Sequence, residues 1–193
     1  EKLDLHVAAH AHGAEGIKNA IRAGVRTIEH GTLIDDEGIE LMRTRGIYMV
    51  PTFVVAYQMR RHSHANIAGH MLEDEQRDLD ERLANLRRAI DAGIKLCYGT
   101  DAGTPFNFHG ENAYQLELLV SLGFLSPERA IYTATGAAAE ALGLSDSIGT
   151  VEPGKEADLI MVDESLIGDL HGLSTSVKAV FKGGLPVHRE CAL

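Results

Sequence analysis

One junction recurs three times in this chain: a helical stretch ends at a glycine, and a β-branched residue opens a strand directly after it. The three copies are Ala23-Gly24-Val25, Arg45-Gly46-Ile47 and Ala92-Gly93-Ile94. Glycine readily takes the left-handed conformation that ends a helix. Strands alternating with helices in this way form right-handed βαβ units with parallel strands. The junctions therefore predict an α/β fold built on a parallel sheet.

Apolar periodicity places the elements between these junctions. We expect neighbouring parallel strands near residues 5–11, 26–30, 47–53 and 95–100. The apolar run behind the third strand extends to Val55, and Pro51 must lie at the end of that strand or at a bulge. We expect helices over 14–23, 36–45 and 73–92, and the last has the clearest apolar stripe. Four such units are half of a (β/α)8 TIM barrel.

The composition changes near Leu144, where a turn-rich segment begins. Before it, Ser126-Pro127-Glu128 is typical of a helix start, and the alanine-rich run 136–142 predicts another short helix. After it, 157–162 and 177–181 have the pattern of strands. We therefore divide the chain into a half barrel, residues 1–143, and a small β module, residues 144–193.

Composition excludes some classes of function. The formal net charge is −10 and no block rich in lysine and arginine offsets it, which argues against nucleic-acid binding. No apolar run approaches the roughly 20 residues that span a bilayer. Cys97 and Cys191 are expected to be free thiols, which fits a reducing compartment, and we expect a cytoplasmic protein.

The chain opens almost directly into a strand without an initiator methionine, so we expect the N-terminal half of the barrel to be absent from it. A half barrel exposes two open strand edges and an apolar inner face. We therefore expect it to be completed by further polypeptide or by another copy of itself, as a homo-oligomer.

Three of the predicted strands end in a potential metal ligand. The first ends at His10 and His12, the second at His30 and the fourth at Asp101. Catalytic groups of a parallel barrel lie at the C-terminal strand ends, where these side chains would converge. Two neutral imidazoles and a carboxylate can hold a divalent metal and leave room for an activated water. Each residue alone could be a polar strand terminus, but three in register favour a metal site.

The residues leave several roles open. His10 and His12 lie on the same face of a strand, so periodicity cannot choose between them as ligand. Asp101 could act as a general base or could cap its loop in an Asx-turn. Tyr57, after the third strand, and His109, in the loop after the fourth, could contact substrate or be exposed surface residues.

These motifs resemble a known family. His10-Ala-His12-Gly13, Ile28-Glu-His30-Gly31 and Gly99-Thr-Asp101 resemble the fifth-, sixth- and eighth-strand motifs of the amidohydrolase superfamily. The segment 149–160 resembles its C-terminal signature, where the chain returns to a β-sandwich. The chain looks most like the branch of Xaa-Pro dipeptidases, arginine or Xaa-Pro carboxypeptidases and imidazolonepropionase-related proteins.

The resemblance implies that His10, His30 and Asp101 bind a divalent metal, first of all zinc, and that Asp101 is the catalytic residue that takes a proton from the attacking water. It favours His12 as a substrate or outer contact, beside Tyr57 and His109. The first-strand His-x-His pair and the fourth-strand lysine of the superfamily have no counterpart here. One or two ions are therefore possible, and the second would need the missing half.

The expected function is that of a metal-dependent hydrolase, which cleaves a C–N amide bond of a dipeptide or another small peptide-like substrate with a metal-activated water. A Xaa-Pro dipeptidase or carboxypeptidase is the first expectation. Two alternatives stay open. One is a cyclic amidohydrolase of the imidazolonepropionase type, and the other is a catalytically incomplete fragment with a structural or assembly role.

Overall fold

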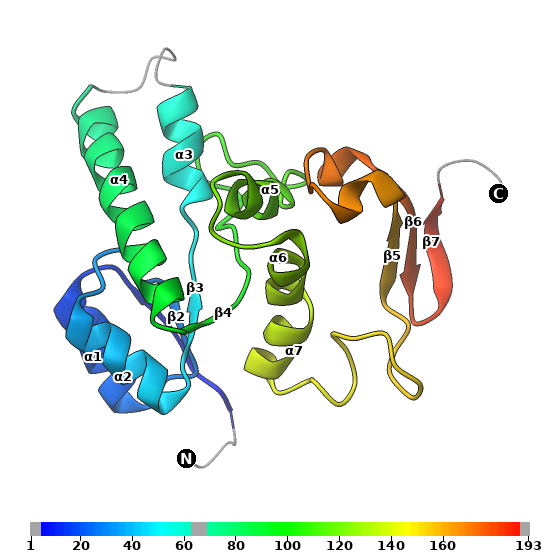
Figure 1. Ribbon diagram of the computed structural model, residues 1–193, viewed down its shortest axis with the longest axis horizontal. Coiled ribbons are helices and arrows are strands. Elements are labelled where there is room, and N and C mark those ends of the chain that lie inside the picture. Colours follow the sequence, from blue (N-terminus) through cyan, green and yellow to red (C-terminus); the bar gives the residue numbers. More distant parts are fainter. Residues whose placement is uncertain (1–4, 63–68, 190–193) are drawn as a thin grey trace. The chain divides into compact units, whose positions relative to one another are not determined.

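The computed structural model describes residues 5–62 and 69–189, and it divides into two compact units, 1–109 and 110–193 (Figure 1). We describe each unit by itself. The boundary between the two units lies after residue 109, whereas the composition indicated one after residue 143. The assignment of 1–143 to the barrel and 144–193 to the β-sandwich therefore stays a prediction.

The first unit is a parallel sheet with its connecting helices. Its elements are β1 (Ala8–Ala11), α1 (Ala14–Ala23), β2 (Thr27–His30), α2 (Asp36–Arg45), β3 (Tyr48–Val50), α3 (Val54–Arg61), α4 (Gly69–Asp91) and β4 (Lys95–Leu96). The strands pair in the order β1-β2-β3-β4, and every pairing is parallel. This confirms the predicted neighbours and the βαβ connections between them.

The three glycine junctions form as predicted. Gly24, Gly46 and Gly93 all have positive φ, at 88°, 64° and 79°. At the first of them the Gly24 N–H donates to the carbonyl groups at the end of α1. Asp35 begins α2, since its side chain accepts a hydrogen bond from the Gly38 N–H. These ends fix the lengths of the helices and so bring each following strand back into the sheet.

The third and fourth strands are shorter than the sequence predicted. β3 ends at Val50, and Val54 and Val55 belong to α3 instead of the strand. Pro51 explains the end of the strand, because it has no N–H to donate to the ladder. β4 ends at Leu96, although one further bond joins the Cys97 N–H to the Met49 carbonyl.

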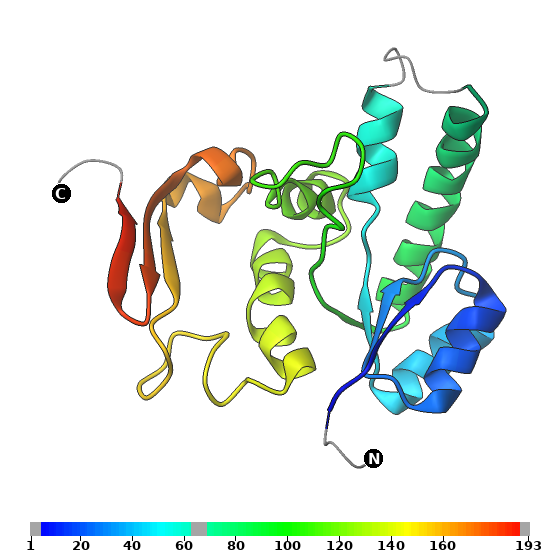
Figure 2. The same cartoon turned by 180° about the vertical axis from the view of Figure 1, so that it is seen from behind.

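The two faces of the sheet differ in character. Ile28, Met49 and Leu96 are buried on the face toward the helices, and α1, α2 and α4 lie to that side in both views (Figures 1 and 2). The opposite face carries one register row of Ala8, Thr27, Tyr48 and Lys95 and a second row of His10, Glu29 and Val50. His10 therefore lies on the face away from the helices, which is the interior of a closed barrel.

A close approach of β3 to the segment after β4 gives a prediction about stability. A Cβ on Gly99 would lie 2.5 Å from Val50 Cγ1, whereas a Cβ on Gly16 in α1 would meet nothing within 4 Å. We expect Gly99→Ala to lower the free energy of unfolding by about 1–3 kcal/mol through overpacking. Gly16→Ala should raise it by about 0.5–1 kcal/mol. Urea unfolding of both variants measures this, and equal stabilities would contradict the packing described.

The described part of the second unit contains three α-helices, two short 3₁₀ helices (η1 and η2) and an antiparallel sheet. Its elements are α5 (Tyr114–Ser121), α6 (Pro127–Ala134), α7 (Gly136–Leu142), β5 (Leu159–Val162), η1 (Glu164–Ile167), η2 (Leu173–Thr175), β6 (Val177–Lys182) and β7 (Leu185–Arg189). The strand order is β5-β6-β7. Ser126 caps α6 through a bond from the Arg129 N–H, as its position before Pro127 predicted.

Two further observations bear on the predictions from composition. No helix in the described ranges is long and apolar enough to cross a membrane. Cys97 is buried, and Cys191 lies outside the described residues.

Candidate metal centre

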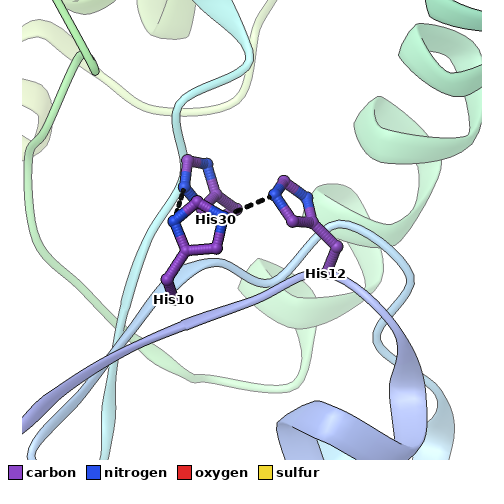
Figure 3. A group of neighbouring side chains, drawn as sticks. All are labelled: His10, His12 and His30. Carbon is purple, nitrogen blue, oxygen red and sulfur yellow. Dashed lines mark hydrogen bonds between the residues drawn. The ribbon is translucent and has the colours of Figure 1, made fainter.

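Three imidazoles meet at the C-terminal ends of β1 and β2 (Figure 3). His10 lies on β1, His12 follows the end of that strand, and His30 is the last residue of β2. One ring nitrogen from each lies within 4.8 Å of the others. His10 is central, with its Nδ1 3.0 Å from His30 Nε2 and its Nε2 3.0 Å from His12 Nε2. Parallel pairing thus brings together residues that are 20 positions apart in the sequence.

Two buried threonines orient the outer imidazoles. Thr32 Oγ1 lies 2.8 Å from His12 Nδ1, and Thr52 Oγ1 lies 2.5 Å from His30 Nδ1. In both histidines the threonine contact occupies Nδ1, so Nε2 is the nitrogen that faces the His10 ring. Partners of this kind fix the tautomer and direction of metal-binding histidines. Sequence reasoning missed both threonines, although each lies two residues beyond a strand end.

A residue of α4 supports the loop that contains Thr32. The Asn85 side chain is buried, and its Nδ2 donates to the Thr32 carbonyl at 3.0 Å. Asn85 Oδ1 in turn accepts a hydrogen bond from Arg88 at 2.8 Å. A helix on the outside of the sheet therefore holds the loop that orients His12.

The backbone at the end of β2 is in an uncommon conformation. His30 has φ 74° and Gly31 has φ 64°. A non-glycine residue with positive φ is sparsely populated, and such residues cluster at functional sites. The positive φ of Gly31 would strain any other residue there, and a Cβ would also displace the end of the Met49 side chain, whose Cε lies 2.7 Å away. The sharp exit after His30 keeps this imidazole at the strand end.

The surroundings of His30 keep its ring neutral. Its pKa is lowered to about 4, first by burial and then by the neighbouring rings of His12 and His10. The negative charge of Asp101 partly opposes this shift, and Arg82 adds to it. A histidine binds a metal as neutral imidazole. His30 is therefore in the ligand state at neutral pH.

This shift predicts a pH dependence in the metal-free chain. Between about pH 6.5 and pH 4 the unfolded state binds more protons at His30 than the folded state does, so stability falls as the pH is lowered through this window. An NMR titration of the His30 ring should give a midpoint near 4. The variant His30→Asn should lose this part of the pH dependence. A midpoint at the ordinary value for histidine would contradict the burial described.

Asp101 lies near the imidazoles but outside their cluster. It follows β4 in an exposed position with φ 57°, and the three-residue group contains only histidines. Its charge nevertheless acts on the pKa of His30. The structure thus brings His10, His12 and His30 together and leaves Asp101 at the edge of the site. Its role as ligand and base remains a proposal.

The two candidate substrate contacts lie on other segments. His109 is exposed, and its Nε2 lies 3.2 Å from the position of a Cβ on Gly103, so its ring covers the loop that carries Asp101. Tyr57 is half-buried within α3 and not at a strand end. Their role as substrate contacts also remains a prediction.

A small pocket adjoins the centre on the side of the helices. It is bordered by His30, Thr52, Met49 and Leu86, and the last two are buried between the sheet and α4. The space suits roughly one water molecule, not a substrate. A substrate would have to approach from the other face of the sheet, where His10 is exposed.

Comparison with known proteins agrees with this geometry. The profile of the amidohydrolase family matches residues 1–187. Ochratoxinase from Aspergillus niger is 32% identical over 181 residues, which cover 92% of this chain and 37% of that protein. Imidazolonepropionase from Thermoplasma volcanium is 28% identical over 192 residues, which cover 95% of this chain and 42% of that protein. The chain thus spans about two fifths of the length of these curated relatives.

Solved structures show the same relation. A Xaa-Pro dipeptidase with methionine bound in its active site superposes with a TM-score of 0.85 at 37% identity, covering 95% of this chain and 45% of that one. The structure of A. niger ochratoxinase gives a TM-score of 0.85 at 31% identity, covering 98% and 43%. These relatives are TIM-barrel proteins, so the parallel sheet described above is part of a barrel, as the sequence predicted.

Proposed function

Because the chain belongs to the amidohydrolase family, we propose that it forms the C-terminal half of a metal-dependent hydrolase that cleaves a C–N amide bond of a peptide-like substrate. One observation carries this proposal: three ring nitrogens from neighbouring strand ends lie within 4.8 Å of one another. The 37% identity to a Xaa-Pro dipeptidase supports a dipeptide substrate.

The donor set fits a divalent metal ion, and zinc in particular. Imidazole nitrogens suit zinc, whereas magnesium and calcium prefer oxygen ligands. His30 is neutral at pH 7, and the threonine contacts direct Nε2 of His12 and His30 inward. A bound ion would polarise the amide carbonyl and lower the pKa of a water to about 7. We propose one ion held by this half and a second only in the complete barrel.

We propose the following roles for the residues of this chain. His10 and His30 would hold the ion, and the contact with Thr52 Oγ1 holds the His30 ring with Nε2 toward the centre. Asp101 accepts a proton from the attacking water and delivers it to the leaving nitrogen. His12, Tyr57 and His109 contact the substrate from the open face. Asp101 would also be a ligand of the ion, beside His10 and His30.

We propose that additional polypeptide supplies the rest of the barrel. Among the described residues, β1 and β4 each pair on one side only, so the sheet has two open edges. We propose that the first half of the barrel closes them, in a homo-oligomeric protein. For the location we propose the cytoplasm, because the positions of Cys97, buried after β4, and Cys191, near the end of the sequence, fit a reducing compartment.

The experiment uses the complete barrel loaded with zinc and compares three substrates: a set of Xaa-Pro dipeptides, N-acyl amino acids and imidazolonepropionate. We expect the highest kcat/KM with a dipeptide, loss of activity with a chelator and recovery with added zinc. Activity on imidazolonepropionate alone would favour the cyclic amidohydrolase. A zinc-loaded, folded protein without activity on any of them would support the alternative of a structural fragment.

A further inference from the structure

The loop that carries Asp101 is folded around a buried asparagine. Asn107 is 3% exposed, and its Nδ2 donates to the Thr100 carbonyl at 2.7 Å and to Thr104 Oγ1 at 3.2 Å. Its backbone N–H donates to the Thr104 carbonyl at 3.0 Å, and its own carbonyl accepts from the Gly103 N–H at 2.8 Å. All four bonds connect Asn107 to residues between Thr100 and Thr104, at the start of the loop.

These bonds hold both peptide groups next to Asp101. The Thr100 carbonyl, which belongs to the peptide before Asp101, accepts from Asn107 Nδ2. The Asp101 carbonyl, which belongs to the peptide after it, accepts from Thr104 Oγ1 at 3.0 Å. Because Thr104 Oγ1 also accepts from Asn107 Nδ2, one side-chain amide connects the two anchors. The direction in which the carboxylate leaves the backbone depends on these two peptide planes.

The loop also has a conformation that needs such support. Asp101 has φ 57° and Phe106 has φ 59°. Residues other than glycine rarely adopt this region, and they keep it only where the surrounding structure over-determines it. Asn107 follows Phe106, and its side chain reaches across the loop to Thr100, the residue before Asp101.

We propose that Asn107 is a positioning residue for Asp101: its side-chain amide, directly and through Thr104, fixes the peptides on both sides of Asp101 and so aims the carboxylate at the centre. This inference rests on the proposed function of Asp101 as the proton acceptor. Asn107 touches neither substrate nor metal in this role. A small displacement of a catalytic group strongly lowers the rate of the reaction. We therefore expect a large effect on kcat from Asn107, although it does not touch the reacting atoms.

The same loop offers a matched control. The rings of Phe106 and His62 stack with their centroids 5.0 Å apart, so His62 holds the outer side of the loop. His62→Ala removes this contact without removing a hydrogen bond to either peptide next to Asp101. If loop anchoring in general mattered, His62→Ala and Asn107→Ala would have similar effects.

The test measures kcat, KM and zinc content of the complete enzyme for Asn107→Ala, Thr104→Val, Thr104→Ser and His62→Ala. We expect Asn107→Ala and Thr104→Val to lower kcat by about 10–100-fold with little change in KM, as other outer contacts of active sites do. Thr104→Ser keeps the hydroxyl and should restore kcat, and His62→Ala should stay near wild type. Faster amide exchange at Gly103 in Asn107→Ala would show the loosened loop independently of activity.

A double-mutant cycle with Asp101→Asn separates positioning from loop stability. If Asn107 acts through Asp101, Asn107→Ala has no further effect on kcat once Asp101 is asparagine. Additive losses, or a normal kcat in both Asn107→Ala and Thr104→Val, overturn the inference and leave the proposed function intact. A normal kcat in Asp101→Asn alone overturns the proposed role of Asp101 and the inference with it. If Asn107→Ala does not fold, Thr104→Val decides by the same criteria.

Discussion

Replacement of Asp101 by asparagine lowers kcat of the complete zinc enzyme by about 10²–10⁴-fold, the usual contribution of general acid–base catalysis. Asparagine has nearly the same shape and also tolerates positive φ, so the loop conformation at φ 57° is kept. The substitution removes the negative charge and the capacity to accept a proton. Steady-state kinetics measure the effect, and zinc analysis of the same sample shows whether the ion is still bound.

Asp80→Asn is the matched control, because Asp80 is an exposed carboxylate that pairs with Arg60 at 3.0 Å. It should leave kcat unchanged. A near-normal kcat for Asp101→Asn with zinc bound would exclude Asp101 as the proton acceptor. His12 and His109 would then be the next candidates to replace.

Replacement of His30 by asparagine removes a nitrogen ligand and should lower zinc affinity by more than the 10–100-fold typical of outer contacts. Asparagine again tolerates the backbone, which has φ 74° at this position. Thr52→Val removes the hydroxyl that lies 2.5 Å from His30 Nδ1 and should cost about 10–100-fold in affinity. Zinc titration against a competing chelator measures both variants.

His171→Asn is the control for His30, because His171 is an exposed histidine in the second unit, where it lies 3.5 Å from Glu117. Its zinc affinity should equal that of the wild type. Added zinc should restore part of the activity of His30→Asn, since the loss concerns coordination and not proton transfer. Unchanged affinity in His30→Asn would remove this histidine from the metal centre.

The strand ends could be predicted because they depend on local rules. Gly24, Gly46 and Gly93 end three helices, and each is followed by a β-branched residue just before the next strand, so parallel neighbours could be predicted from the sequence. Parallel strands end at one edge, which is why the sequence also places His10 and His30 together. His12 joins them because the strand period puts it on the face of His10.

The elements that escaped prediction depend on tertiary contacts. The residues from Gln115 to Leu119 in α5 are all buried, so no apolar stripe distinguishes the helix from a buried strand. Val54 and Val55 are β-branched and favour a strand locally. Both nevertheless lie in α3, which begins three residues after Pro51.

The supporting residues of the site were missed for a similar reason. Thr32, Thr52 and Asn107 carry no motif, and each becomes meaningful only through the atom that it contacts. The positive φ of His30 and Asp101 is equally invisible in the sequence, because both residues usually take other conformations.

The most direct test of the account is the location of zinc in crystals of the complete protein, by anomalous diffraction at the zinc edge. The account predicts one ion at the C-terminal ends of β1 and β2, bonded at roughly 2.0–2.1 Å to ring nitrogens of His10 and His30. An ion bound elsewhere, or no ion in a protein that hydrolyses its substrate, would contradict it.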